Sequence, residues 1–118
     1  MNNLNDFIQE LYNNFNDRKS ELVISHLTAD VKWANGMEGG HVYGHSGVRE
    51  YWTRQFTMFS SKVTPLEIGE ENGIIKIKVH QLVHDLYGNL LTDENVYHFF
   101  KFRNNKIAEF DIAEKSKK

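Results

Sequence analysis

One histidine occurs on the apolar side of an alternating stretch near the C-terminal end of the chain. That side consists of Val96, His98, Phe100 and Phe102. An imidazole with a pKa close to neutral pH can accept or donate a proton, so His98 is a candidate general acid or base. The alternative is a buried neutral histidine that is hydrogen-bonded to a neighbour such as Gln81 or Asp111, which is commoner for a lone histidine on an apolar face.

Two further polar residues can be placed by the same alternation. Gln81 shares one strand face with several branched apolar residues, so its side chain is expected to point inward. Asp111 has an apolar residue on either side, so it should face away from them unless a bulge reverses the order. Asp111 is therefore a weak candidate partner for His98.

The chain has six histidines and no cysteine. His80 and His84 share a strand face but lie about 13 Å apart at ~3.3 Å per residue, too far for one ion. His41 and His45 have helical spacing, but Gly44 interrupts a continuous helix between them. The glycine-rich stretch 36–47 lacks the Gly-Lys-Ser/Thr ending of a phosphate-binding loop. We expect no metal site and no cofactor, and the lack of cysteine excludes disulfides and a thiol nucleophile.

Length and charge limit the classes of function. With 118 residues, 40% of them hydrophobic, the chain is expected to form a single domain over residues 1–118. A net charge of −2 with mixed signs argues against nucleic acid as a partner. No apolar run approaches the ~18 residues of a membrane span, and the N-terminus lacks the features of a signal peptide. We therefore expect a cytoplasmic protein that does not insert into membranes.

Three stretches have the apolar spacing of helices. The stripe from Leu4 to Phe15 predicts an amphipathic helix, and residues 17–27 predict a second, shorter one. A third helix is predicted from Ser46, which would be its N-cap, to Phe59. Gln55 is a polar residue on the buried stripe of this third helix.

The rest of the pattern is typical of strands. Short strands are predicted at 30–34 and 41–43, and four longer ones follow at 62–70, 74–86, 90–102 and 106–114. Asn72-Gly73 between the first two long strands is a strong hairpin turn signal. The order predicts an α+β fold in which three N-terminal helices pack on a curved antiparallel sheet. A pocket is expected between the two layers.

Aromatic residues are candidates for the wall of that pocket. Trp33, Trp52, Phe56 and Phe100 come from a strand, from the third helix and from a later strand. They could surround an apolar ligand, or they could fill the space completely.

The sequence resembles the SnoaL-like branch of the nuclear transport factor 2-like superfamily. The resemblance covers nearly the whole chain and is carried by Asp30-Val31-Lys32-Trp33 and by the run from Gly39 to Trp52, which includes Tyr-Gly-His-Ser-Gly-Val-Arg-Glu-Tyr-Trp. It implies a cystatin-like, cone-shaped fold with an apolar pocket and frequent dimers through the outer sheet face. Members include ketosteroid isomerases, cyclases, dehydratases, hydrolases and non-catalytic binders, so the fold alone does not decide the function.

The isomerases of this superfamily supply residue roles that can be compared. Tyr12 matches their helix tyrosine, which is part of the oxyanion hole, although it could simply belong to the core with its hydroxyl bonded locally. The position of their catalytic base falls on Asn35, whose amide cannot accept a proton at useful pH. The position of their second oxyanion group falls on Tyr97 or His98, depending on the alignment of the last hairpin.

Two hypotheses follow for the function. The first is a protein that binds a small apolar or aromatic molecule, with lining residues Trp33, Asn35, Trp52, Phe56, Gln81 and Phe100. Any reaction would be an acid–base isomerisation, dehydration or cyclisation in which His98 moves the proton and Tyr12 or Tyr97 stabilises the oxyanion. The second is a homodimerisation or binding module with a filled core, whose outer sheet face carries Leu82, Tyr97 and Phe99.

Overall fold

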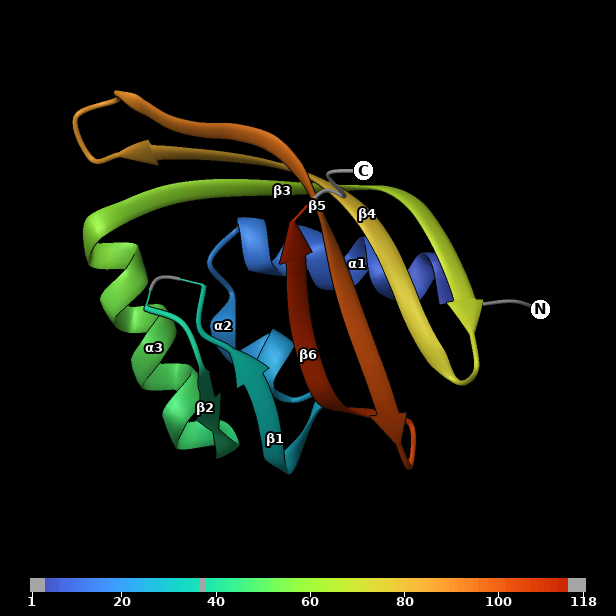
Figure 1. Ribbon diagram of the computed structural model, residues 1–118. Helices are drawn as coiled ribbons and strands as arrows, with labels where there is room; N and C mark the ends of the chain where they lie inside the picture. Colours follow the sequence, from blue (N-terminus) through green and yellow to red (C-terminus); the bar gives the residue numbers. More distant parts are fainter. Residues whose placement is uncertain (1–3, 37, 115–118) are drawn as a thin grey trace.

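The computed structural model describes residues 4–36 and 38–114 (Figure 1). Its helices are α1 (Leu4–Asn16), α2 (Ser20–Ile24) and α3 (Gly44–Met58). Its strands are β1 (Leu27–Ala34), β2 (His41–Tyr43), β3 (Phe59–Glu71), β4 (Ile74–Asp85), β5 (Leu90–Arg103) and β6 (Lys106–Glu114). The predicted α+β class and the order of its elements are confirmed.

All six strands join one sheet in the order β2-β1-β6-β5-β4-β3. The four long strands form the predicted antiparallel meander. The sheet departs from the expected antiparallel arrangement at one pair, because β1 and β6 run parallel. Parallel neighbours need a long crossover, and here α3 and the strands β2 to β5 lie between them in the chain.

The long strands curve around the helices (Figure 1). Register shifts lie at Pro65–Glu67 in β3, Val83–His84 in β4 and Lys101–Phe102 in β5. Such irregularities bend a strand and increase its twist, so they help the sheet to form a concave face. Helix α1 packs against β3 and α3 against β1, which places both helices on that face.

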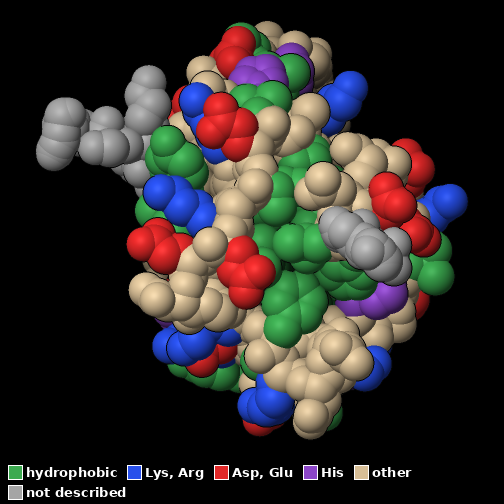
Figure 2. Space-filling view, turned by 90° about the vertical axis from the view of Figure 1, so that its right-hand side faces the viewer, with side chains coloured by type: hydrophobic (Ala, Val, Ile, Leu, Met, Phe, Trp, Pro, Cys, Tyr) green, Lys and Arg blue, Asp and Glu red, His purple; other side chains and the backbone are tan. Residues whose placement is uncertain are grey.

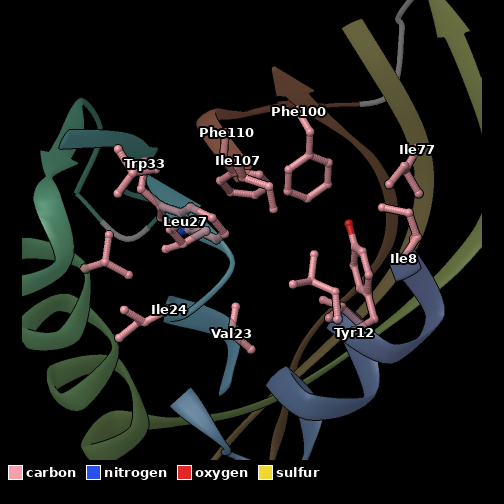
Figure 3. Close-up of a cluster of buried hydrophobic side chains, with 14 of the residues drawn as sticks. Ile8, Tyr12, Val23, Ile24, Leu27, Trp33, Ile77, Phe100, Ile107 and Phe110 are labelled. Carbon is pink, nitrogen blue, oxygen red and sulfur yellow. The ribbon is translucent and has the colours of Figure 1, made fainter. Parts of the chain in front are cut away.

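Apolar side chains from both layers form the core. Helix α1 buries Ile8, Leu11 and Tyr12, the residues of its predicted stripe. Figure 3 shows side chains from α1, the two ends of β1, β5 and β6 pointing toward a common centre. Figure 2 shows the side of the molecule where α1 begins, with hydrophobic side chains gathered in the middle of the face and charged ones around them.

The boundaries of two predicted helices are wrong. Helix α2 spans only five residues, and Leu27 already belongs to β1 rather than to the helix. Helix α3 starts at Gly44 with Tyr43 as its N-cap residue, so Ser46 lies inside the helix instead of capping it. The reason is the backbone of Gly44, whose φ of 75° lets the chain turn from β2 directly into the helix.

No helix in the described ranges is long and apolar enough to cross a membrane.

Candidate functional site

A cavity of about 600 Å³ lies between the helices and the concave face of the sheet. Most of its lining is apolar, and aromatic rings from α1, β1, α3, β5 and β6 contribute to it. This size falls in the range of small-molecule sites. This space favours the ligand-binding hypothesis over the filled-core alternative, because side chains do not occupy it.

Tyr12 and His98 form a hydrogen-bonded pair in this lining. The Tyr12 hydroxyl lies 2.6 Å from Nδ1 of His98, and both side chains are buried. The two rings are stacked, and the ring of Phe110 packs nearly perpendicular to the imidazole. Helix α1 and strand β5 thus bring together two residues that are 86 positions apart. The prediction that His98 would bond to Gln81 or Asp111 is wrong. The prediction that the Tyr12 hydroxyl would bond locally is also wrong.

Burial decides the charge of this pair. It lowers the pKa of His98 to about 3 and raises the pKa of the Tyr12 phenol well above its usual value. Both groups are consequently neutral at pH 7. The expectation of an imidazole with a near-neutral pKa is wrong, because the surrounding rings replace water and nothing charged compensates.

Four of the predicted lining residues are in the cavity wall. They are Trp33, Trp52, Gln81 and Phe100. The two indoles meet edge to face at 5.3 Å, and Trp33 also contacts the ring of Phe100. Helix α3 and strands β1, β4 and β5 therefore each contribute one predicted residue to the site.

Three predicted residues lie elsewhere. Phe56 packs against Phe15 and under the guanidinium of Arg18, because it sits at the edge of the α3 stripe and not at its centre. Tyr97 points to the outer face of the sheet, where the ammonium group of Lys76 lies 4.7 Å from its ring. This follows from the strand alternation that turns its neighbour His98 inward, and it removes Tyr97 from any oxyanion site in the cavity.

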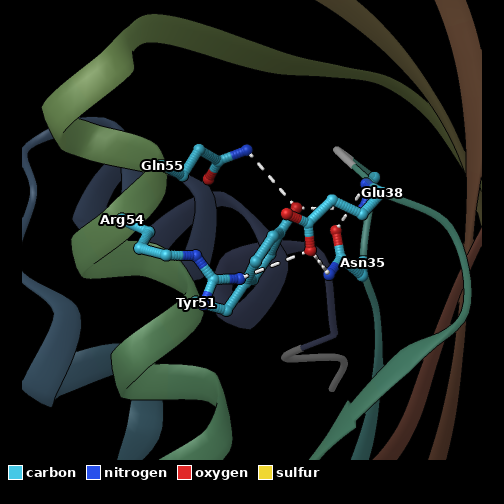
Figure 4. A network of polar contacts seen from close by, with 6 residues as sticks. Asn35, Glu38, Tyr51, Arg54 and Gln55 are labelled. Carbon is cyan, nitrogen blue, oxygen red and sulfur yellow. Dashed lines mark hydrogen bonds and ion pairs between the residues drawn. The ribbon is translucent and has the colours of Figure 1, made fainter.

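Asn35 is the third of these residues, and it is buried in the loop beside the cavity. Its Oδ1 accepts the backbone N–H of Glu38 at 2.9 Å, and its Nδ2 donates to Oε1 of Glu38 at 3.2 Å (Figure 4). Its backbone also bonds to Gly39 and Gly40. Asn35 therefore shapes the loop and does not line the cavity.

Contacts to helix α3 hold that loop, and Tyr51, Gln55 and Glu38 among the residues involved line the cavity. Tyr51 accepts the backbone N–H of Gly36 at 2.9 Å, and Arg54 lies 3.6 Å from the carboxylate of Glu38 (Figure 4). The Gln55 amide nitrogen is 3.5 Å from the Tyr51 hydroxyl, a long contact. Its oxygen is buried with no hydrogen-bond partner among the described residues. The helical stripe could have predicted Tyr51, whereas no sequence signal indicated Glu38.

Three of the other histidines have single polar contacts that account for them. His41 pairs with Asp111 at 2.7 Å and His80 with Asp93 at 2.8 Å. His45 lies 3.0 Å from the backbone oxygen of Leu27. Within residues 4–36 and 38–114, no group of three potential metal ligands occurs.

Solved structures with the same fold include a protein of unknown function and two proteins determined together with a small molecule. An NTF2-like protein of unknown function from Burkholderia pseudomallei is 24% identical, with a TM-score of 0.84 over 98% of this chain and 92% of that one. TerC, co-crystallised with polyporic acid, is 23% identical, with a TM-score of 0.81 over 96% of this chain and 91% of TerC. A protein with a ketosteroid isomerase-like fold from Catenulispora acidiphila, in complex with trimethylamine, is 12% identical. Its TM-score is 0.71 over 81% of this chain and 75% of that one.

No protein with a curated description matches the chain. The sequence profile of the SnoaL-like domain matches residues 8–110, which run from within α1 to the middle of β6. Because this match covers far more than half of the sequence, the chain belongs to the SnoaL-like domain family.

Proposed function

We propose that this protein binds a small apolar or aromatic molecule in the cavity between its helices and its sheet. The observation that carries the proposal is the cavity itself: about 600 Å³, walled mostly by apolar and aromatic side chains, with one buried polar pair, Tyr12 and His98. Apolar walls with few polar groups are typical of sites that take organic ligands. The ligand complexes of TerC and of the Catenulispora protein support this proposal.

The chemistry available to the site is hydrogen bonding to a ligand oxygen. A histidine with a pKa of about 3 is a poor general base near neutral pH, because its affinity for a proton is low. Neutral groups in a mostly apolar cavity can still stabilise charge that develops on an oxygen during isomerisation, dehydration or cyclisation. Any reaction would thus use Tyr12 and His98 for stabilisation and would not use His98 as the base.

Thermal unfolding with a ligand panel tests the proposal. Steroids, polyketide-like aromatics and small hydroxy-ketones should include a compound that raises the midpoint in a saturable way. A ligand at 100 times its dissociation constant adds ~2.7 kcal/mol, which is about 10 °C for a chain of this length. A flat response across the whole panel would contradict the proposal.

A pair of substitutions on β4 tells cavity binding from surface binding. Val83 lines the cavity, and Leu82 is its neighbour on the opposite sheet face; both are half-buried. Val83→Trp should fill part of the cavity and reduce the ligand-induced shift, whereas Leu82→Trp should leave that shift unchanged. Equal loss in both variants would place the ligand outside the cavity.

Two further expectations remain predictions. A homodimer would use the outer sheet face, where Leu82, Tyr97 and Phe99 are half-buried in the single chain. Light scattering should give about twice the 13.8 kDa mass of the chain, and the monomer mass would contradict it. A cytoplasmic location is the other expectation, and fractionation of cells that express the protein tests it.

A further inference from the structure

We infer that Tyr12 fixes the tautomer of His98, so that the cavity presents an imidazole N–H donor and selects ligands that carry a carbonyl oxygen. This inference rests on the proposed function, because it names the class of ligand that the same cavity takes. It gives Tyr12 a positioning role and makes His98 the residue that contacts the ligand.

The argument starts from the phenol proton of Tyr12. The hydroxyl is buried, and its polar contact among the described residues is Nδ1 of His98 at 2.6 Å. If Nδ1 carried the imidazole proton and donated it to Tyr12, the phenol proton would be left in the core without an acceptor. The arrangement that satisfies both groups has Tyr12 donating and Nδ1 accepting.

The second step concerns the other imidazole nitrogen. Burial keeps the ring neutral, so it carries a single N–H, and with Nδ1 as acceptor the proton must be on Nε2. His98 lines the cavity, and its Nε2 has no hydrogen-bond partner within the described ranges. The rings of Tyr12 and Phe110 hold the imidazole plane in place. The site therefore offers a fixed donor, without a positive charge, to an apolar space.

A neutral donor in such a space favours one kind of ligand. A ketone, aldehyde or quinone oxygen can accept the Nε2 proton, whereas an apolar group of the same shape leaves that proton unsatisfied. The cavity volume leaves room for two or more fused rings around that oxygen. The proposed ligand class is thus an aromatic or alicyclic carbonyl compound.

The tautomer can be observed without any ligand. In protein labelled with ¹⁵N at histidine, long-range ¹H–¹⁵N spectra at pH 7 distinguish a protonated from a bare ring nitrogen, and the signal missing from His98→Asn assigns His98. We expect a bare Nδ1 and a protonated Nε2. In Tyr12→Phe the two tautomers should mix, an effect that loss of packing alone would not produce. A protonated Nδ1 in the wild-type protein would overturn the inference.

Ligand selection is measured with two probes of nearly the same shape, 2-acetylnaphthalene and 2-isopropenylnaphthalene, which differ by C=O against C=CH₂. The preference for the ketone, measured by calorimetry as a ratio of dissociation constants, should fall about three- to tenfold in His98→Phe relative to wild type. Tyr12→Phe should lower it in the same direction. Tyr97→Phe is the matched control, since it removes a tyrosine hydroxyl from the outer face, and it should leave the ratio unchanged.

The outcomes separate the two proposals. If both probes bind and the ratio is the same in all four proteins, the inference about His98 is wrong and cavity binding stands. If neither probe nor any compound of the aromatic panel binds, the proposed function fails, and the ligand class fails with it. If Tyr97→Phe lowers the ratio as His98→Phe does, the donor lies on the outer face and the inference is overturned.

Discussion

Burial of His98 makes the stability of this protein depend on pH in a way that one substitution should remove. The imidazole has a pKa of about 3 in the folded chain and 6.5 when it is exposed to water. Between these values the unfolded chain binds a proton that the folded chain does not, so stability falls as the pH is lowered from 6.5 toward 3. Well above pH 6.5 the imidazole is neutral in both states, so His98 causes no loss of stability there. His98→Asn should abolish this dependence, because an amide keeps an acceptor for Tyr12 but does not titrate.

The size of the effect follows from the two pKa values. Lowering the pH from 7 to 5 should cost the wild-type protein about 2 kcal/mol through His98. With an unfolding entropy of roughly 2.1 cal/mol/K per residue, that corresponds to a midpoint about 8 °C lower. Urea unfolding at several pH values measures it, and the fluorescence of Trp33 and Trp52 reports the transition because both indoles are in the core.

Other titrating groups should not obscure the comparison. Hydrogen bonds from Arg103 to Asp30 and from Asn89 to Asp85 lower the pKa values of these exposed carboxyl groups. Their contribution is lost only as the pH falls further, and it is the same in both proteins. Parallel pH profiles of wild-type protein and His98→Asn would refute the reasoning, since they would mean that His98 titrates alike in the folded and unfolded chains.

The remaining predictions concern stability. Gln55→Leu should raise the free energy of unfolding by about 1 kcal/mol, because it removes a buried amide oxygen without a partner; a loss of more than 1 kcal/mol in urea unfolding would contradict this. Gly44→Ala should destabilise by at least about 1 kcal/mol, since φ is 75° and the new Cβ would lie 3.3 Å from the backbone oxygen of Ala29. Gly47→Ala, inside α3 at ordinary contact distances, should stabilise by roughly 0.5–1 kcal/mol in the same assay. If Gly44→Ala were the more stable of the two alanine variants, the described backbone of the turn into α3 would be wrong.

Periodicity in the sequence was enough for most of the fold. Helix α1, the four-strand meander and the face on which Gln81 and His98 lie all follow from the spacing of apolar residues. The parallel pairing of β1 with β6 could not be predicted in this way, because it depends on how elements far apart in the chain are stacked. The start of α3 depends on the positive φ of Gly44, which composition alone does not reveal.

The candidate site was predicted less completely, for a similar reason. Strand alternation places Trp33 and Phe100 on the same face of the sheet. A hydrogen bond between Tyr12 and His98, which are 86 positions apart, has no local sequence signal. Asn35 was expected to line the cavity, but its bonds to Glu38 hold it in the loop, and these bonds are properties of the loop conformation that no sequence pattern indicates. The low pKa of His98 could not be foreseen, since it results from the density of rings around it and not from its neighbours in sequence.

The most direct test of the central claim is to locate a bound ligand by NMR. Nuclear Overhauser effects between unlabelled 2-acetylnaphthalene and ¹³C-labelled protein report which side chains lie within a few ångströms of the ligand. Cavity binding predicts contacts to the methyl groups of Val83 and Val96 and to the indole of Trp33. Contacts confined to Leu82 and Tyr97 on the outer sheet face would contradict it.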